Sequence, residues 1–265
     1  MAPDTSPSQP RRRGAGRQAR QRASLSLEQI VATAIATLDR DGAEKLTLRS
    51  LAAELGSGVA SLYWYASGKE ELMGIVADEL LGRALAQVDR LAADGREAPP
   101  EFAAHPAPAA DRQTSAASAR GLIRLRRMVL CLFVQMIEHR WLAGQLVKAG
   151  PDQENSLMFW ERIGQVLQGM ELTVDQQFHA SIAVVNYASG MGVEISQTAR
   201  DRAEMDDPAA MFTAQVEEWE SLSEERFPFV RSIIGAFVQF DDASEFIAGL
   251  DLLLAGIERQ TWADR

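Results

Sequence analysis

The amino-acid sequence predicts an all-α protein. Apolar residues recur at helical spacing in nearly every segment, as Leu48, Leu51 and Leu55 do within one short stretch. The alternating polar and apolar pattern of a half-buried strand is missing throughout. With 265 residues, 46% of them hydrophobic, the chain can bury a helical core. We expect about nine or ten helices, in a three-helix N-terminal domain at 24–72 and a larger helical domain at 73–265.

The first helix has recognisable start and stop signals. Ser26 and Gln29 have the spacing of a capping box, in which each side chain bonds the other residue's backbone. Leu25 and Ile30 are spaced to pack together across this start. Gly42 ends the apolar repeat.

Three further helices are expected in the N-terminal part. A short helix over 48–55 is broken by Gly-Ser-Gly at 56–58, and a still shorter helix covers 59–65. Ser67-Gly68-Lys69-Glu70 has the pattern of a second capping box. It opens a long amphipathic helix that runs to about residue 94.

Residues 95–119 differ in composition from their surroundings. Prolines lie among Ala, Ser and Thr with little periodicity, which predicts a linker or mobile loop. The helical pattern then resumes. The later helices are expected at Leu122–His139, Trp141–Lys148, Glu154–Gln168, Val174–Thr198, Met205–Leu222 and Ser244–Trp262.

Charge is unevenly distributed along the chain. The formal net charge is −10, yet residues 1–23 hold six arginines against the single acid Asp4. This arm lacks large apolar residues, so we expect it to be disordered when free. A basic arm on an acidic body suggests a polyanionic partner, although an ordinary solvated tail has the same composition. The arginines are Arg11, Arg12, Arg13, Arg17, Arg20 and Arg22.

Several classes of protein and site are disfavoured. Cys131 is the single cysteine, which excludes a disulfide framework and fits a reducing cytoplasm. No stretch reads as a membrane span or a secretory signal. The three histidines lack metal-ligand spacing, and residues 56–58 lack the features of a phosphate loop or a nucleophile elbow. We therefore expect no metal, cofactor or membrane partner, and a helical enzyme is the least favoured function.

Residues 47–69 carry the functional signal. Two short helices joined through a glycine have the form of a helix-turn-helix, whose second helix enters the DNA major groove. In this reading Ala52 lets the helices cross closely, Gly56 supplies a left-handed turn and Leu62 fills their contact. Spacing alone also fits an ordinary αα-hairpin.

The residues themselves resemble a known family. Leu46–Gly56 together with Leu62–Leu72, which reads LYWYASGKEEL, is similar to the DNA-binding domain of TetR family transcriptional regulators of bacteria. A second resemblance, to the tetracycline-repressor-like C-terminal domain, rests on His139–Leu142 and on the segment from Phe246 to Ile257. Tyr65 departs from the family, which commonly has His at this position.

The resemblance implies roles for residues in 24–72, the DNA-binding domain. Lys69 would pair with a phosphate at a helix N-terminus, and Arg49 would contact a base edge. Tyr63, with Tyr65, would donate to the phosphate backbone. Trp64 would be exposed on the recognition helix, although a core position is the alternative. The other exposed recognition positions would be Val59, Ala60 and Ser61. The arginine arm would enter the adjacent minor groove.

The resemblance also implies that 73–265 binds a ligand and forms a homodimer. The dimer candidates are the helices at 174–198 and 244–262, the second with the stripe Ile247, Leu250, Leu254 and Ile257, although intramolecular core is an equal interpretation. An apolar cavity is expected for a small hydrophobic effector. Its candidate contacts, which plain core would equally explain, are Phe133, Met136, His139, Trp141, Trp160, His179, Asn186 and Tyr187.

The predicted function is therefore that of a cytoplasmic bacterial repressor. It would bind a palindromic operator in double-stranded DNA as a homodimer, associating with the nucleoid when bound. A small hydrophobic effector, such as an antibiotic or a biosynthetic metabolite, would release it by favouring the conformation that does not bind DNA. A ligand-independent DNA-binding regulator is the alternative.

Overall fold

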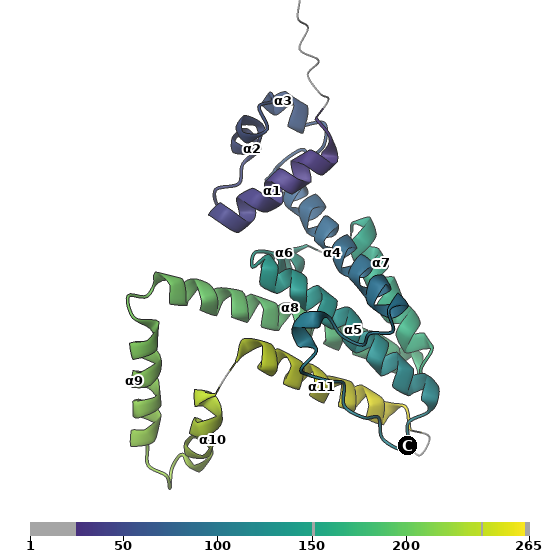
Figure 1. Ribbon diagram of the computed structural model, residues 1–265, viewed down its shortest axis with the longest axis vertical. Coiled ribbons are helices and arrows are strands. Elements are labelled where there is room, and N and C mark those ends of the chain that lie inside the picture. Colours follow the sequence, from purple (N-terminus) through teal and green to yellow (C-terminus); the bar gives the residue numbers. More distant parts are fainter. Residues whose placement is uncertain (1–24, 150–151, 240, 263–265) are drawn as a thin grey trace, which may run out of the picture.

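The computed structural model describes residues 25–149, 152–239 and 241–262. Within these ranges the chain forms eleven α-helices and one short 3-10 helix, with no strand, which confirms the predicted all-α class. A small helical head stands above a larger helical body, and α4 joins the two (Figure 1). None of the described helices is long and apolar enough to cross a membrane.

Local sequence signals explain the head. Its helices are α1 (Leu27–Asp41), α2 (Leu48–Glu54), α3 (Val59–Leu62) and the start of α4 (Lys69–Ala93). The predicted capping box of Ser26 with Gln29 is present, and Thr47 forms another with Ser50 at the start of α2. Gly56 has φ of +61°, the left-handed turn that the sequence predicted.

The start of α4 differs from the prediction. The helix begins one residue later than a Ser67 cap requires, so Gly68 is the N-cap. Glycine has no side chain with which to cap the helix. Ser67 instead donates both its backbone N–H and its hydroxyl to the Glu71 carboxylate, at 2.7 and 2.6 Å. Ser67 therefore pairs with Glu71, four positions later, and not with Glu70, three positions later, as the capping box predicted.

The body is built around α5 (Ala116–Glu138), which packs against α4, α7 and α8. Phe133 on α5 stacks between Phe102 and Phe246, with ring centroids 5.8 and 3.5 Å away. Arg126 is buried and pairs with Asp251 at 2.7 Å, joining α5 to α11. The other body helices are α6 (Leu142–Lys148), α7 (Glu154–Gln168), α8 (Val174–Glu204) and α11 (Asp242–Gln260).

The segment 95–119 is attached to the body more firmly than a plain linker would be. A 3-10 turn at Pro100–Phe102 inserts the buried Phe102 into the core. Farther on, Thr114 donates to Glu258 of α11 at 2.6 Å. Residues 116–119 already belong to α5. The sequence did not predict these contacts, because they join the segment to residues that lie far away along the chain.

A hairpin of two helices extends from the body. It consists of α9 (Pro208–Ser221) and α10 (Pro228–Val238), which lie beside each other and away from the other helices (Figure 1). The sequence analysis missed α10, and this omission explains the expected count of nine or ten. It is a short, mainly apolar helix of eleven residues that begins at Pro228.

Candidate DNA-binding surface and ligand cavity

The predicted recognition residues lie mostly on an open surface of the head. Trp64 is 89% exposed and Tyr63 58% exposed, so the core position considered for Trp64 is wrong. Both follow directly after α3. Arg49 on α2 is also exposed, while Lys69 is half-buried at the first residue of α4. On α3, Ala60 and Ser61 are exposed and Val59 is half-buried against the core.

Contacts among α1, α2 and α3 fix the position of this surface. Ala52 and Leu62 are each only 1% exposed, so α2 and α3 meet closely as predicted. Glu54 at the end of α2 accepts from Thr37 at 2.9 Å and from Arg40 at 3.2 Å, both on α1. The Arg40 hydrogen bond, with that from Thr37, lowers the pKa of Glu54, and Asp41 with Glu54 raises the pKa of Arg40. The three helices thus form one unit.

Tyr65 is placed differently from its predicted role. It is half-buried, and its hydroxyl donates a short hydrogen bond to the carbonyl of Leu25. A hydroxyl has one proton to donate, so in this conformation it is not available to a phosphate. The structure therefore gives the Tyr65 hydroxyl a partner within the protein. Its bond instead fixes the end of the recognition segment to the residues that precede α1.

The arginine arm is not covered by the structure. Arg11, Arg12, Arg13, Arg17, Arg20 and Arg22 all lie outside the described residues. The first described residue is Leu25, which Tyr65 contacts. Leu25 itself therefore lies next to the recognition segment.

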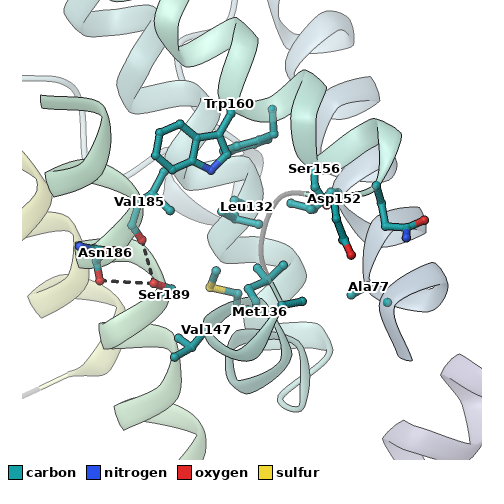
Figure 2. A pocket seen from close by; sticks show the side chains of 16 residues that line it. Ala77, Leu132, Met136, Val147, Asp152, Ser156, Trp160, Val185, Asn186 and Ser189 are labelled. Atoms are coloured by element: carbon teal, nitrogen blue, oxygen red, sulfur yellow. Dashed lines mark hydrogen bonds between the residues drawn. The ribbon is translucent and has the colours of Figure 1, made fainter. Parts of the chain in front are cut away.

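A cavity of about 260 Å³ lies inside the body (Figure 2). Helices α4, α5, α6, α7 and α8 all contribute to its wall, which is mainly apolar. Asn186 and Ser189 bring polar groups from α8, and Trp160 lines it from α7. The lining residues are Gly74, Ala77, Leu81, Leu132, Met136, Leu146, Val147, Ala149, Asp152, Gln153, Ser156, Phe159, Trp160, Val185, Asn186 and Ser189.

Three of the eight predicted ligand contacts line this cavity, namely Met136, Trp160 and Asn186. Phe133 lies in the aromatic stack of the core. Tyr187 donates to the carbonyl of Phe246 at 2.8 Å and fastens α8 to α11.

The remaining predicted contacts also lie away from the cavity. His179 is exposed beside Phe178. His139 and Trp141 face the head: His139 Nδ1 lies 2.9 Å from an Asp39 carboxylate oxygen, and Trp141 Nε1 donates to Asp39 at 2.8 Å. Helical spacing shows which residues share a face but not what that face meets, so it did not predict these positions.

The sequence analysis missed the contribution of α4 to the cavity. Gly74, Ala77 and Leu81 read as the apolar face of an ordinary helix. A hydrogen bond between helices holds α4 at this position. Asp78 on α4 accepts from the backbone N–H of Ser156 at 2.8 Å and so caps the start of α7. A short-range pattern does not carry this information, since the two residues are far apart in the sequence.

The predicted dimer stripe turns inward. Ile247, Leu250, Leu254 and Ile257 are each 6% exposed or less, so they belong to the core of the subunit. The opposite face of α11 carries Leu252, which is 76% exposed. The intramolecular interpretation of the stripe is therefore the correct one.

Two family models match the chain. The model of the tetracyclin repressor-like C-terminal domain matches residues 123–261, which is more than half of the sequence. The chain belongs to the TetR family. A second model, of bacterial regulatory proteins of the tetR family, matches residues 30–74. TetR family members are DNA-binding transcriptional regulators, not enzymes, and this chain is such a regulator.

Individual relatives agree with the TetR assignment. The chain is 29% identical over 239 residues to the HTH-type transcriptional repressor DrrR1 of Streptomyces coeruleorubidus, covering 89% of this chain and 78% of that protein. The transcriptional regulator SCO7222, a TetR from Streptomyces coelicolor, has a similar structure, with a TM-score of 0.67, 27% identity and coverage of 89% and 99%. ActR from Streptomyces coelicolor, in complex with actinorhodin, shares the fold at 22% identity and a TM-score of 0.70, with coverage of 91% and 99%.

Proposed function

We propose that this TetR family regulator is a cytoplasmic repressor that binds palindromic operator DNA as a homodimer and is released by a small hydrophobic ligand. The single observation that carries the proposal is that α4 connects the recognition surface with the cavity. This helix begins at Lys69, beside the recognition surface, and lines the cavity through Gly74, Ala77 and Leu81. A ligand that favours one position of α4 therefore changes the position of the DNA-binding head.

DNA contact is assigned to the exposed recognition residues. Arg49, Tyr63 and Trp64 offer a guanidinium, a hydroxyl and an apolar ring, which suit a base edge, a phosphate and a thymine methyl or sugar surface. Ala60 and Ser61 are small enough for close approach, and Lys69 supplies a positive charge for a phosphate. The repressor role is supported by the relative DrrR1, which is described as a repressor.

The test for DNA contact is a gel shift with the DNA upstream of the gene. Trp64→Ala should weaken operator binding about tenfold, because one apolar base contact contributes about 1–3 kcal/mol. Its free energy of unfolding should change by less than about 0.5 kcal/mol, since the side chain is exposed. Leu157→Ala, at an exposed leucine on α7, is the control. Equal operator affinity of the Trp64 variant and the control would contradict the proposed surface.

The arginine arm is proposed to follow the minor groove beside the recognition site. Its charge, and the contact of Tyr65 with Leu25 at its root, support this assignment. Removal of residues 1–23 should weaken operator binding and reduce its dependence on salt concentration. If the truncated protein binds the operator with the same salt dependence as the full chain, the arm is an ordinary solvated tail.

A second copy of the chain is the proposed partner of the outer faces of α8 and α11. Leu252 on α11 and Gly190 on α8 are exposed in the subunit. The α9–α10 hairpin adds Phe229, which is 72% exposed. In light scattering, Leu252→Glu should convert a dimer to a monomer, whereas Leu157→Glu should leave the dimer intact. A Leu252→Glu protein that stays dimeric would place the interface elsewhere.

The cavity is the proposed site for the ligand. Its mainly apolar wall with a few polar groups is typical of small-molecule sites, and the related ActR was solved with actinorhodin. We expect some member of a panel of hydrophobic metabolites to release operator DNA. Val147→Trp places an indole at the exposed edge of the cavity and should weaken this release at least about tenfold, with operator affinity retained. Val174→Trp, on an exposed valine outside the lining, is the control. If no compound of the panel releases operator DNA, the alternative of a ligand-independent regulator is favoured.

A further inference from the structure

A second cavity, of about 210 Å³, lies between α4, α5 and α7. It shares no lining residue with the first cavity and lies farther along the same three helices, near the C-terminal end of α4. The lining residues are Val88, Asp89, Ala92, Arg124, Arg127, Met128, Arg162, Gln165 and Val166.

The charge of this cavity is opposite to that of the whole chain. Three guanidinium groups, from Arg124, Arg127 and Arg162, line it together with one carboxylate, from Asp89. The chain as a whole has a formal net charge of −10. Three positive charges against one negative charge give this cavity a net attraction for an anion.

The arginines are only partly satisfied by the protein. Arg162 pairs with Asp89 at 2.6 Å, which uses the one carboxylate of the lining. Arg127 donates through Nη1 to the carbonyl of Arg96 at 3.1 Å, while its Nε is shielded from solvent and has no hydrogen-bond partner among the described residues. The cavity lining therefore holds one carboxylate for three guanidinium groups, which leaves donors of Arg124 and Arg127 without a carboxylate partner in the lining.

Apart from the amide of Gln165, the remaining wall is apolar. Val88, Ala92, Met128 and Val166 contribute side chains without charge. At about 210 Å³ this cavity is smaller than the first cavity of about 260 Å³. The cavity therefore fits a small anion that carries an apolar group, rather than a large ligand.

We propose that this arginine-lined cavity is a second ligand site, which binds a small organic oxyanion, a carboxylate or a phosphate ester on an apolar skeleton. The guanidinium groups bind the oxyanion in their planar, two-pronged geometry. The apolar wall covers the rest of the molecule. Because the site spans α4, α5 and α7, the bound anion joins these helices at the end of α4 that is remote from the DNA-binding head.

The test is calorimetry on the full-length protein without DNA, so its outcome is independent of the proposed repressor function. The probes are benzoate, phenyl phosphate and benzamide, the last a neutral molecule of the same shape as benzoate. At least one of the two anions should bind with one site per subunit, and benzamide should not. The two anions together distinguish a carboxylate site from a phosphate site.

Variants assign the binding to this cavity. Arg124→Gln and Arg162→Gln should each weaken binding about tenfold or more, since a charge-assisted hydrogen bond is lost. Arg124 is exposed, so its replacement should leave the fold unchanged, which circular dichroism would check. Arg83→Gln removes the same charge from an exposed position of α4 outside the lining and should bind as the wild type does. No binding of either anion, equal binding of benzamide, or equal weakening by Arg83→Gln would overturn the proposal.

Discussion

Asp39 of α1 accepts a hydrogen bond from the indole Nε1 of Trp141 at 2.8 Å, which joins the DNA-binding head to the turn between α5 and α6. His139 lies on the same carboxylate at 2.9 Å. Directly after this turn, α6 brings Leu146 and Val147 to the wall of the first cavity. The head therefore meets the body at two places, through α4 and through Asp39.

This contact predicts an energetic coupling between the two parts. Trp141→Phe removes the indole donor and keeps an aromatic ring, and Asp39→Ala removes the acceptor. A double-mutant cycle measured by urea unfolding should give a coupling energy of about 1 kcal/mol, less than a buried charged hydrogen bond because Asp39 is partly exposed. Strictly additive effects of the two substitutions would show that the contact contributes nothing.

Gly56 predicts a backbone effect. Its φ of +61° is unfavourable for any residue with a Cβ atom, so Gly56→Ala should destabilise the protein by about 1 kcal/mol. Gly164→Ala is the matched control, since this glycine lies within α7 and an added Cβ would meet nothing within 4 Å. That change should stabilise by about 0.5–1 kcal/mol. Thermal unfolding of both variants checks the opposite signs, and a shared sign would contradict the assignment.

Ser57, in the same turn, predicts a stabilising substitution. Its hydroxyl is shielded from solvent and has no hydrogen-bond partner among the described residues. Ser57→Ala removes this unsatisfied group and should raise the free energy of unfolding by about 1 kcal/mol. Ser61→Ala, on the exposed face of α3, should change it by less than about 0.5 kcal/mol. Chemical denaturation measures the change. A lower free energy of unfolding for Ser57→Ala would mean that the hydroxyl has a hydrogen-bond partner, which contradicts the prediction.

Glu71 predicts a dependence of stability on pH. The hydroxyl and backbone N–H of Ser67 both donate to its carboxylate, and they lower the pKa of Glu71. A lowered pKa in the folded state means that the stabilisation is present above the unfolded pKa of about 4.3 and is lost as the pH falls through the folded value. The difference in melting temperature between wild type and Glu71→Gln should therefore be largest near pH 7 and shrink in acid.

Glu70→Gln is the control for this prediction. It removes the same charge from the same helical turn but breaks no bond to Ser67. Identical pH profiles for the Glu70 and Glu71 variants would mean that the helix dipole, rather than Ser67, stabilises the charge.

Cys131 should be chemically inert in the folded protein. Burial raises the pKa of its thiol to about 12, so the reactive thiolate is scarce at neutral pH. Iodoacetamide at pH 8 should leave the native protein unmodified and alkylate it fully in guanidinium chloride, as measured by mass spectrometry. Rapid alkylation of the native protein would indicate that the core around α5 opens.

The local features of the head were predictable from sequence because their causes lie within a few residues. The capping box of Ser26 and Gln29, the left-handed turn at Gly56 and the exposed Trp64 each follow from neighbouring side chains or from which helix face is already occupied. The family motif adds DNA recognition to the same short stretch. The long helix α4 was predictable for the same reason.

The first cavity, the inward stripe of α11 and the Asp39 contact were decided only by the tertiary structure. Helical periodicity identifies an apolar face but contains no information about the distant residues that pack on it. Phe133 and Met136 lie on the same helix, yet one packs in an aromatic stack and the other lines the cavity. That difference arises because packing between helices far apart in sequence determines which apolar side chains are covered and which border a space.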